Sequence, residues 1–175
     1  MLSSYRSTDS SGLYRKSSKE LYSERFYEDM DMESEDLHYY NEKCNNITVK
    51  KHKDQMIPIC TKYLRFLDKS KSWGYVNSRY DISLLLNYWI YEKLTEIYGD
   101  NSSDDIMLGF VDLQMKWGYF DYNRKTYDPY YKNCQPDLDK VNHVDWKHRK
   151  KLYDYYVDHD YVINMAASFD NECTY

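Results

Sequence analysis

The chain has 175 residues, a formal net charge of −5 and an isoelectric point near 5.5. That length suits one domain, and the acidic balance argues against a general nucleic-acid binder. Five glycines and three prolines are too few for the many turns of an all-β protein, so long helices fit better. The first twelve residues lack the apolar stretch of a secretory signal, and no apolar run is long enough to span a membrane.

Tyrosine is the most unusual feature of the composition, with 22 residues. Compositional bias is one explanation, since asparagine, lysine, aspartate and isoleucine are also common. A tyrosine-rich recognition surface is the other, because the ring covers a large area and its hydroxyl forms hydrogen bonds. The sequence leaves both explanations open.

Residues 1–18 are rich in serine and poor in apolar groups, so we expect a disordered N-terminal segment and a helical domain over 19–175. Ser17 and Glu20 have the spacing of a capping box, which predicts a helix over 19–43. The acidic stretch of this helix fits a solvated face better than a cation site, because no glycine turn accompanies the carboxylates.

A second helix is predicted over 54–68, where apolar residues recur every three or four positions. Pro58 is tolerated in the first turn of a helix, which places the beginning of this one near 54–57. The polar stretch 45–53 contains a glycosylation tripeptide that begins at Asn46, so we expect the stretch to be exposed.

The densest apolar pattern lies at 81–98, DISLLLNYWIYEKLTEIY, and predicts the central helix of the core. Asp81 can cap this helix, because its carboxylate can accept a backbone N–H of the first turn. Gly99 can end it, because glycine leaves a helix in a left-handed conformation without a Cβ clash. The apolar positions are Ile82, Leu85, Leu86, Trp89, Ile90, Leu94 and Ile97.

Two more helices are predicted after the central one. The first covers 104–119 and has an apolar stripe at Ile106, Phe110, Leu113 and Trp117. The last covers 144–165, and we expect its inner face to hold Trp146, Leu152, Tyr153, Tyr156, Val157 and Ile163. The stretch 120–141 between them is long for an unstructured connection, so it is either a covering loop held by Cys134 or an exposed binding loop.

The four cysteines lie far apart, and their spacing matches no zinc motif. Such a set allows three disulfide pairings, and four buried reduced thiols are the alternative. An oxidising compartment would favour the bridges. The candidate disulfide cysteines are Cys44, Cys60, Cys134 and Cys173.

No catalytic, cofactor-binding or metal site is predicted. His143, His148 and His159 do not share a helix face with a third ligand. The acidic pair at 104–105 is explained by its place at the positive end of a helix dipole, so it is not interpreted as an acid–base dyad. The basic run 147–151 spreads around a helix and therefore does not form one phosphate-binding patch.

Two segments resemble signatures of the Plasmodium interspersed repeat family, in its Vir branch. Residues 84–94, LLLNYWIYEKL, resemble the family's LNYWIYDKL, and residues 145–157, DWKHRKKLYDYYV, resemble W..+K.LYDYYV. Cys134 with Pro136, and NECTY at 171–175, match the family in order and spacing. The core signature of the two segments consists of Leu86, Trp89, Leu94, Trp146, Leu152, Tyr153 and Tyr156.

The resemblance implies an all-α, disulfide-linked domain without enzymatic activity, and we expect about five helices. Family members are multigene variant proteins exported to infected red cells or displayed on them. The expected function is a variant antigen in antigenic variation, immune evasion or adhesion, with a host cell-surface receptor or an antibody as partner. The alternative is a soluble interaction or trafficking module inside the parasite or its host cell. We expect the contacts at 45–53 and 119–141.

The sequence departs from the family at three points. Ser83 stands where members commonly have a cysteine, so one bridge is expected to be missing. The chain stops just after Cys173, where members continue, and it lacks their transmembrane segment. We therefore expect a short or truncated member, whose anchoring at a surface stays open.

Overall fold

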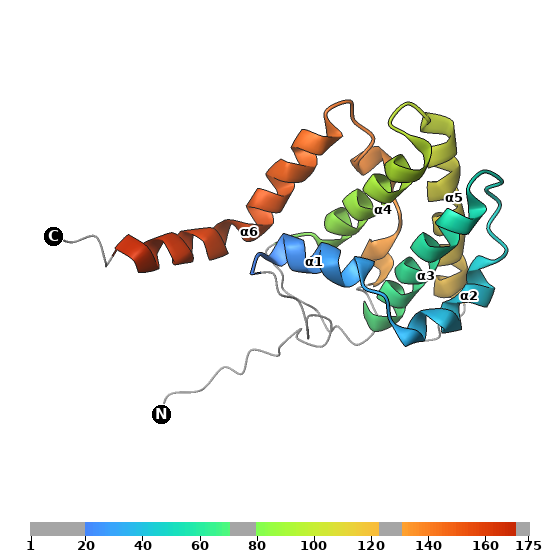
Figure 1. The fold of residues 1–175 in the computed structure, drawn as a ribbon, viewed down its shortest axis with the longest axis horizontal. Coiled ribbons are helices and arrows are strands. Elements are labelled where there is room, and N and C mark those ends of the chain that lie inside the picture. Colours follow the sequence, from blue (N-terminus) through green and yellow to red (C-terminus); the bar gives the residue numbers. More distant parts are fainter. Residues whose placement is uncertain (1–19, 71–79, 123–130, 171–175) are drawn as a thin grey trace.

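The computed structural model describes residues 20–70, 80–122 and 131–170. Within these ranges every regular element is a helix, which confirms the all-α prediction, and the α-helices number six rather than about five (Figure 1). The N-terminal segment 1–18 and Cys173 lie outside the described residues. The elements are α1 (Tyr22–Asp31), η1 (Glu35–Leu37), α2 (His38–Cys44), α3 (Lys53–Lys69), α4 (Ile82–Tyr98), α5 (Ser103–Tyr122), η3 (Tyr131–Cys134), η4 (Leu138–Lys140) and α6 (Trp146–Asp170).

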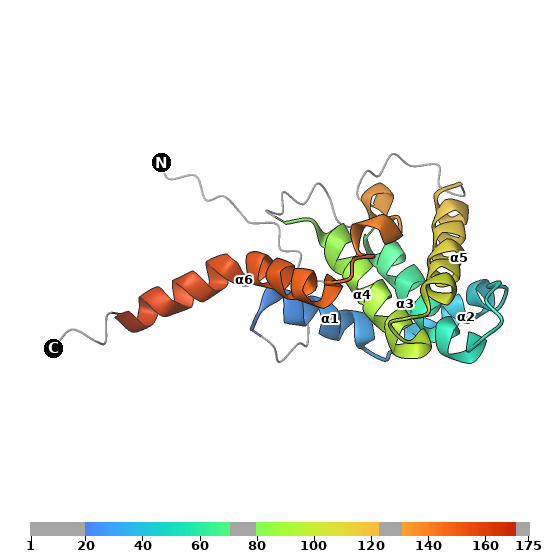
Figure 2. The same ribbon diagram turned by 90° about the horizontal axis from the view of Figure 1, so that it is seen from above.

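Helix α4 lies at the centre of the fold, as its apolar pattern predicts (Figures 1 and 2). It contacts α1, α3, α5, η3 and η4, and eleven of its 17 residues are buried. Three of these belong to the core signature, and each is at most 1% exposed: Leu86, Trp89 and Leu94. A helix that is apolar on most sides has to be surrounded by other elements, and α4 is.

The cap at the start of α4 is as predicted, and Gly99 ends the helix with a positive φ, although its ψ of 153° lies outside the left-handed helical region. The carboxylate of Asp81 accepts a hydrogen bond from the backbone N–H of Ser83 at 2.9 Å. Gly99 has a φ of 86°, and its N–H donates to the carbonyl of Thr95 at 2.8 Å. A cap residue at one end and a glycine with positive φ at the other therefore set the length of this helix locally.

Helix α3 begins earlier than predicted. His52, with a φ of 51°, precedes its first residue, so Pro58 lies in the second turn rather than the first. Proline cannot donate a hydrogen bond to the carbonyl of Asp54, four residues earlier. Asp54 and Pro58 are both exposed, so water can donate a hydrogen bond to that carbonyl in place of the proline. The helix therefore tolerates the proline at this position.

The single helix predicted over 19–43 is wrong, because the chain forms α1 and α2 with a break between them. Cationic side chains of α3 bind the last carbonyls of α1. Lys62 donates to the carbonyl of Asp31 at 2.7 Å, and Arg65 donates to that of Asp29 at 3.1 Å. These bonds take the place of a further helical turn. The donors lie more than 30 residues away, so no local pattern reveals the break.

A disulfide between Cys44 and Cys60 joins the end of α2 to α3, with the two Cα atoms 5.9 Å apart. The alternative of four reduced thiols therefore does not hold. Cys134 is buried at the end of η3. The bridge closes a short loop that contains the connection 45–53.

The connection 45–53 is less exposed than expected. The backbone N–H and hydroxyl of Thr48 and the N–H of Val49 donate to the buried carboxylate of Asp112 in α5, at 2.7–2.9 Å. The side chains of Ile47 and Val49 are buried in the core. A carboxylate with several donors holds the middle of this connection against α5.

The described part of the connection before α6 covers the core. The hydroxyl of Tyr63 in α3 donates to the carbonyl of Cys134 at 3.0 Å, and Gln114 in α5 donates to that of Pro136 at 2.7 Å. Burial raises the pKa of Tyr63 well above its ordinary value, so its hydroxyl stays protonated and donates. These contacts favour the covering-loop interpretation for 131–141, while 123–130 lie outside the described residues.

Helix α6 lies against α1 with its first half, where Trp146 also packs against Tyr91 of α4, and its second half extends beyond the other helices (Figures 1 and 2). Trp146 and Val157 are buried and Tyr153 is half-buried, as expected for an inner face. The prediction is wrong for Leu152, Tyr156 and Ile163, which are 52–68% exposed. Aspartates that bind α1 occupy the inward-facing side of α6 instead of these three residues.

Candidate functional site

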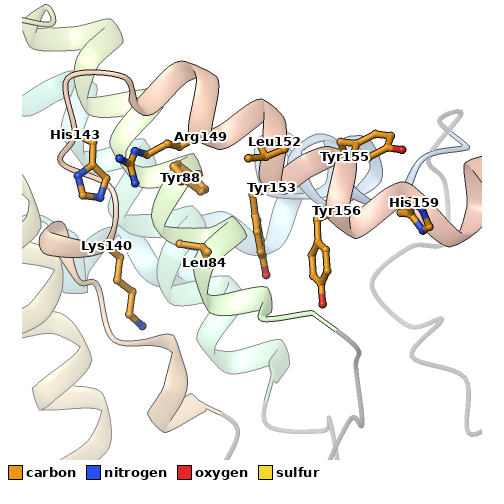
Figure 3. Close-up of a pocket in the computed structure, with 10 residues that line it drawn as sticks. All are labelled: Leu84, Tyr88, Lys140, His143, Arg149, Leu152, Tyr153, Tyr155, Tyr156 and His159. Atoms are coloured by element: carbon orange, nitrogen blue, oxygen red, sulfur yellow. The ribbon is translucent and has the colours of Figure 1, made fainter.

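A groove with a volume of about 620 Å³ lies between α6, the outer side of α4 and the loop around η4 (Figure 3). Six of its lining residues come from α6, two from α4 and two from the loop, so three separate parts of the chain build it. The lining residues are Leu84, Tyr88, Lys140, His143, Arg149, Leu152, Tyr153, Tyr155, Tyr156 and His159.

A row of tyrosine rings runs along the groove. The ring centroids of Tyr88 and Tyr153 are 6.3 Å apart, and those of Tyr153 and Tyr156 are 5.9 Å apart with nearly parallel planes. The side chains of Tyr153 and Tyr156 point the same way from α6 (Figure 3). Rings at these distances pack against one another and form an apolar wall of the groove.

Tyr153 is the fixed member of this row. Its hydroxyl donates to the carbonyl of Asp81 at 2.9 Å and accepts from the N–H of the same residue at 2.8 Å. Burial raises the pKa of Tyr153 and of Tyr88, so both hydroxyls are protonated at neutral pH. Tyr156, whose ring stacks on that of Tyr153, is 58% exposed.

Two carboxylates set the orientation of α6 by binding α1. Asp158 accepts hydrogen bonds from the N–H and the hydroxyl of Ser23, at 2.9 and 2.5 Å. Asp154 accepts from the hydroxyl of Tyr27 at 2.7 Å, and its burial raises its pKa. Positions 154 and 158 are one turn apart, so they share a face of α6. With that face turned to α1, the face of Leu152 and Tyr156 is turned to the groove and to solvent.

The charged groups at the rim of the groove are already paired. Arg149 binds Asp145 at 2.7 Å, and Lys140 lies 3.9 Å from Asp137. The hydrogen bond and charge of Arg149 lower the pKa of Asp145. Exposed pairs of this kind contribute little to stability. The groove therefore offers apolar surface and hydroxyl groups rather than a strong electrostatic field.

The basic run in the first turns of α6 behaves as its helical spacing predicts. Lys147 binds Asp100 at 2.8 Å, and Lys150 binds Asp154 at 3.3 Å, so neighbouring cations point to different parts of the surface. They do not assemble into one phosphate-binding patch.

The residues predicted as a core signature divide into two sets. Those in α4 and Trp146 of α6 are buried in the core, whereas Leu152, Tyr153 and Tyr156 of α6 line the groove. The apolar pattern does not single out Tyr88 or Tyr155 as groove residues. The enrichment of tyrosine in the two family segments is the signal that points to them.

The expected contact segment 45–53 and the disulfide are far from the groove. They lie beside α2, and α2 and α6 are at opposite ends of the molecule in both views (Figures 1 and 2). The structure therefore does not bring these predicted residues together with the tyrosine row.

The lining of the groove is suited to binding. Over residues 20–70, 80–122 and 131–170, no group of three histidine, cysteine or carboxylate side chains is arranged to hold a metal ion. In the same part of the chain, no helix is both long and apolar enough to cross a membrane. What the lining residues can do is cover an apolar partner with rings and bind its polar groups with hydroxyls.

Fold and groove together define a helical protein with an open, tyrosine-lined surface. The family model for the Plasmodium vivax Vir protein matches residues 21–175, and the chain belongs to this family. It is a family of variant surface antigens and is not known for enzymatic activity. The searches of curated proteins and of solved structures found no match.

Proposed function

We propose that this chain is a non-enzymatic variant antigen of infected red cells that binds a host cell-surface receptor through the groove between α4 and α6. One observation carries the proposal. The second family segment, at 145–157, places Leu152, Tyr155 and Tyr156 on the surface at 55–68% exposure. Burial in the core does not account for these side chains, whereas contact with a partner does.

The chemistry of the groove supports a protein as the partner. Tyrosine is enriched in binding surfaces because it combines a large contact area with a polar group at low entropic cost. The rim cations are neutralised by Asp145 and Asp137, so attraction of a highly charged ligand is not favoured. An exposed apolar surface of this kind is also accessible to antibodies, which fits roles in antigenic variation and immune evasion.

Export to the infected red cell, or display on it, is the location that fits this function. The disulfide between Cys44 and Cys60 supports it, because structural disulfides persist in oxidising surroundings. A soluble interaction or trafficking module inside the parasite or host cell is the competing function.

Antibody labelling of intact and permeabilised infected red cells separates the two functions. Serum raised against this chain should label intact cells if the chain is displayed. Labelling that appears only after permeabilisation would contradict display and favour the internal module.

A cell-binding assay with the purified chain tests the groove itself. Tyr156→Ser should weaken binding to host cells by about tenfold or more, because exposed tyrosines at the centre of an interface carry much of its affinity. The matched control is Tyr39→Ser in α2, which removes a similarly exposed tyrosine at the other end of the molecule. Equal effects of the two substitutions would contradict the assignment of the groove.

A further inference from the structure

Helix α5 has a solvent-facing side that is entirely apolar from 107 to 119. Its exposed side chains there are 40–69% exposed: Met107, Leu108, Val111, Met115 and Tyr119. The outer side of a surface helix normally carries charged or polar residues. Four turns without a single exposed charge therefore require an explanation.

The two charged residues within this stretch are turned away from the exposed side. Asp112 is fully buried and accepts hydrogen bonds from Thr48 and Val49. Lys116 is half-buried and donates to the side chain of Asn46, and its burial lowers its pKa. Both charges serve the connection 45–53, so they do not solvate the outer side of α5.

The core does not explain the outer side either. The opposite side of α5 is the one that packs inward, with Ile106, Phe110 and Leu113 at most 2% exposed. Gly109 lets α5 approach α4 closely, since a Cβ there would lie 2.9 Å from the side chain of Leu94. Helix α5 therefore has two apolar sides, one packed inward and the other exposed.

The exposed side of α6 is different in character. Its apolar residues alternate with exposed charges up to Asp160, including Lys147 and Lys151, and the uncharged stretch 161–168 beyond them contains the exposed polar residues Asn164 and Ser168. In α5, Met107, Val111, Met115 and Tyr119 follow one another every four residues with no exposed polar residue between them.

We propose that this side of α5, here called the α5 ridge, is the interface of a homodimer in which two copies of the chain pack their ridges together. Side chains every fourth residue form the ridges that interdigitate when two helices cross at about −50°. The five exposed side chains offer roughly 500 Å² per copy, so a pair that covers them completely buries about 1,000 Å², the threshold that a biological interface has to reach.

The charge distribution favours a second copy as the occupant. The chain has a net charge of −5, so two copies repel each other over most of their surfaces. The α5 ridge has no exposed charge, so two ridges can pack together without like charges in direct contact. An anionic membrane surface would require a basic rim, whereas Asp104 is exposed at one end of the ridge and Asp105 is paired with Lys51.

The same residues set the orientation of the pair. A parallel arrangement would place the acidic first turns of the two α5 helices side by side. An antiparallel arrangement about a two-fold axis separates them and aligns the helix dipoles favourably. Val111 then lies at the crossing point opposite Val111 of the other copy.

Light scattering after size exclusion tests the proposal with the purified chain. At about 100 μM, well above the Kd of most specific dimers, the mass should be twice the 21.4 kDa of the chain. Val111→Glu should halve it, because two carboxylates would face each other at the crossing point. The matched control is Val162→Glu on α6, a valine of nearly equal exposure, which should leave the dimer intact.

Three outcomes would overturn the proposal: a wild-type monomer at that concentration, a dimer that survives Val111→Glu, or equal dissociation by the two glutamates. A monomer would assign the ridge to a different protein or to a membrane surface instead. Circular dichroism checks that both variants fold. Where Val111→Glu does not fold, Val111→Cys replaces it and should form a symmetric disulfide between copies on mild oxidation, whereas Val162→Cys should not.

Discussion

Helices α4 and α6 carry the two family segments, yet they differ in how they are held. In α4 the segment is surrounded by other helices, and its large side chains are almost fully buried. Among the described side chains of α6 only Trp146, Val157 and Asp158 are buried, and hydrogen bonds from α1 hold the helix in place. A segment that identifies a family is therefore structural in one helix and a surface feature in the other.

The difference shows what each kind of contact does. Apolar burial fixes the position of α4 from several sides, and stability follows from the area removed from water. Hydrogen bonds to two aspartates fix the rotation of α6 about its own axis. That rotation, rather than apolar burial, turns Leu152 and Tyr156 outward and creates the groove.

The largest expected effect lies in α4. Trp89→Ala should lower the free energy of unfolding by about 3–5 kcal/mol, because it leaves a large cavity. It also removes the hydrogen bond from the indole N–H to Asp31 at 2.9 Å. Chemical denaturation measures the change, and a loss below about 1 kcal/mol would contradict the central position of this helix.

The disulfide has the next largest expected effect on stability. It joins α2 to α3, so it belongs with the buried helices around α4 rather than with α6. Replacing Cys44 and Cys60 by alanine should cost about 3 kcal/mol, the value expected for a closed loop of this length. Thermal unfolding of the unsubstituted chain with and without reductant also measures the contribution of the bridge to stability. An unchanged melting temperature on full reduction would show that the bridge contributes nothing.

A smaller and more local effect is expected in α6. Asp158→Ala should cost about 1–3 kcal/mol, because it leaves the buried donors of Ser23 without an acceptor. Hydrogen exchange should become faster in α6 while the amides of α4 stay protected. Asp160→Ala, at an exposed position of the same helix, is the control. Faster exchange in both helices would mean that α6 is part of the core after all.

The smallest effect concerns Asp29 in α1, the helix that contacts both α4 and α6. Its carboxylate is buried, and no described residue donates a hydrogen bond to it. Desolvation raises its pKa to about 6, so the folded state binds its proton more tightly than the unfolded state.

Stability should therefore fall as the pH rises from 4 through 6, the range between the ordinary and the raised pKa. Asp29→Asn should remove this fall and stabilise the protein at pH 7 by about 1 kcal/mol, a value reduced for solvent screening. At pH 4 and below, the two proteins should be nearly equal in stability. The same pH dependence in both would contradict the assignment to Asp29.

Local signals predict what is determined locally. The cap at Asp81, the exit at Gly99 and the inner stripe of α5 follow from nearby residues. The break after Asp31 does not, because it depends on Lys62 and Arg65 in another helix.

The apolar pattern of the sequence does not predict the groove, for the same reason. An apolar stripe assigns Leu152 to the inside and Asp158 to the outside, since a carboxylate is normally solvated. The structure reverses them, because Ser23 supplies two hydrogen bonds to the buried carboxylate. Only the partner in α1, distant in sequence, determines which side of α6 faces inward.

The most direct test compares two leucines of the core signature, Leu86 in α4 and Leu152 in α6. Leu86→Ala should cost about 2–5 kcal/mol in free energy of unfolding and Leu152→Ala less than about 0.5, because the first is fully buried and the second is 68% exposed. In the cell-binding assay, Leu152→Ala should weaken binding, although this variant is nearly as stable as the unsubstituted protein. Equal costs for the two substitutions, or normal binding by Leu152→Ala, would contradict the division between a structural segment and a surface segment.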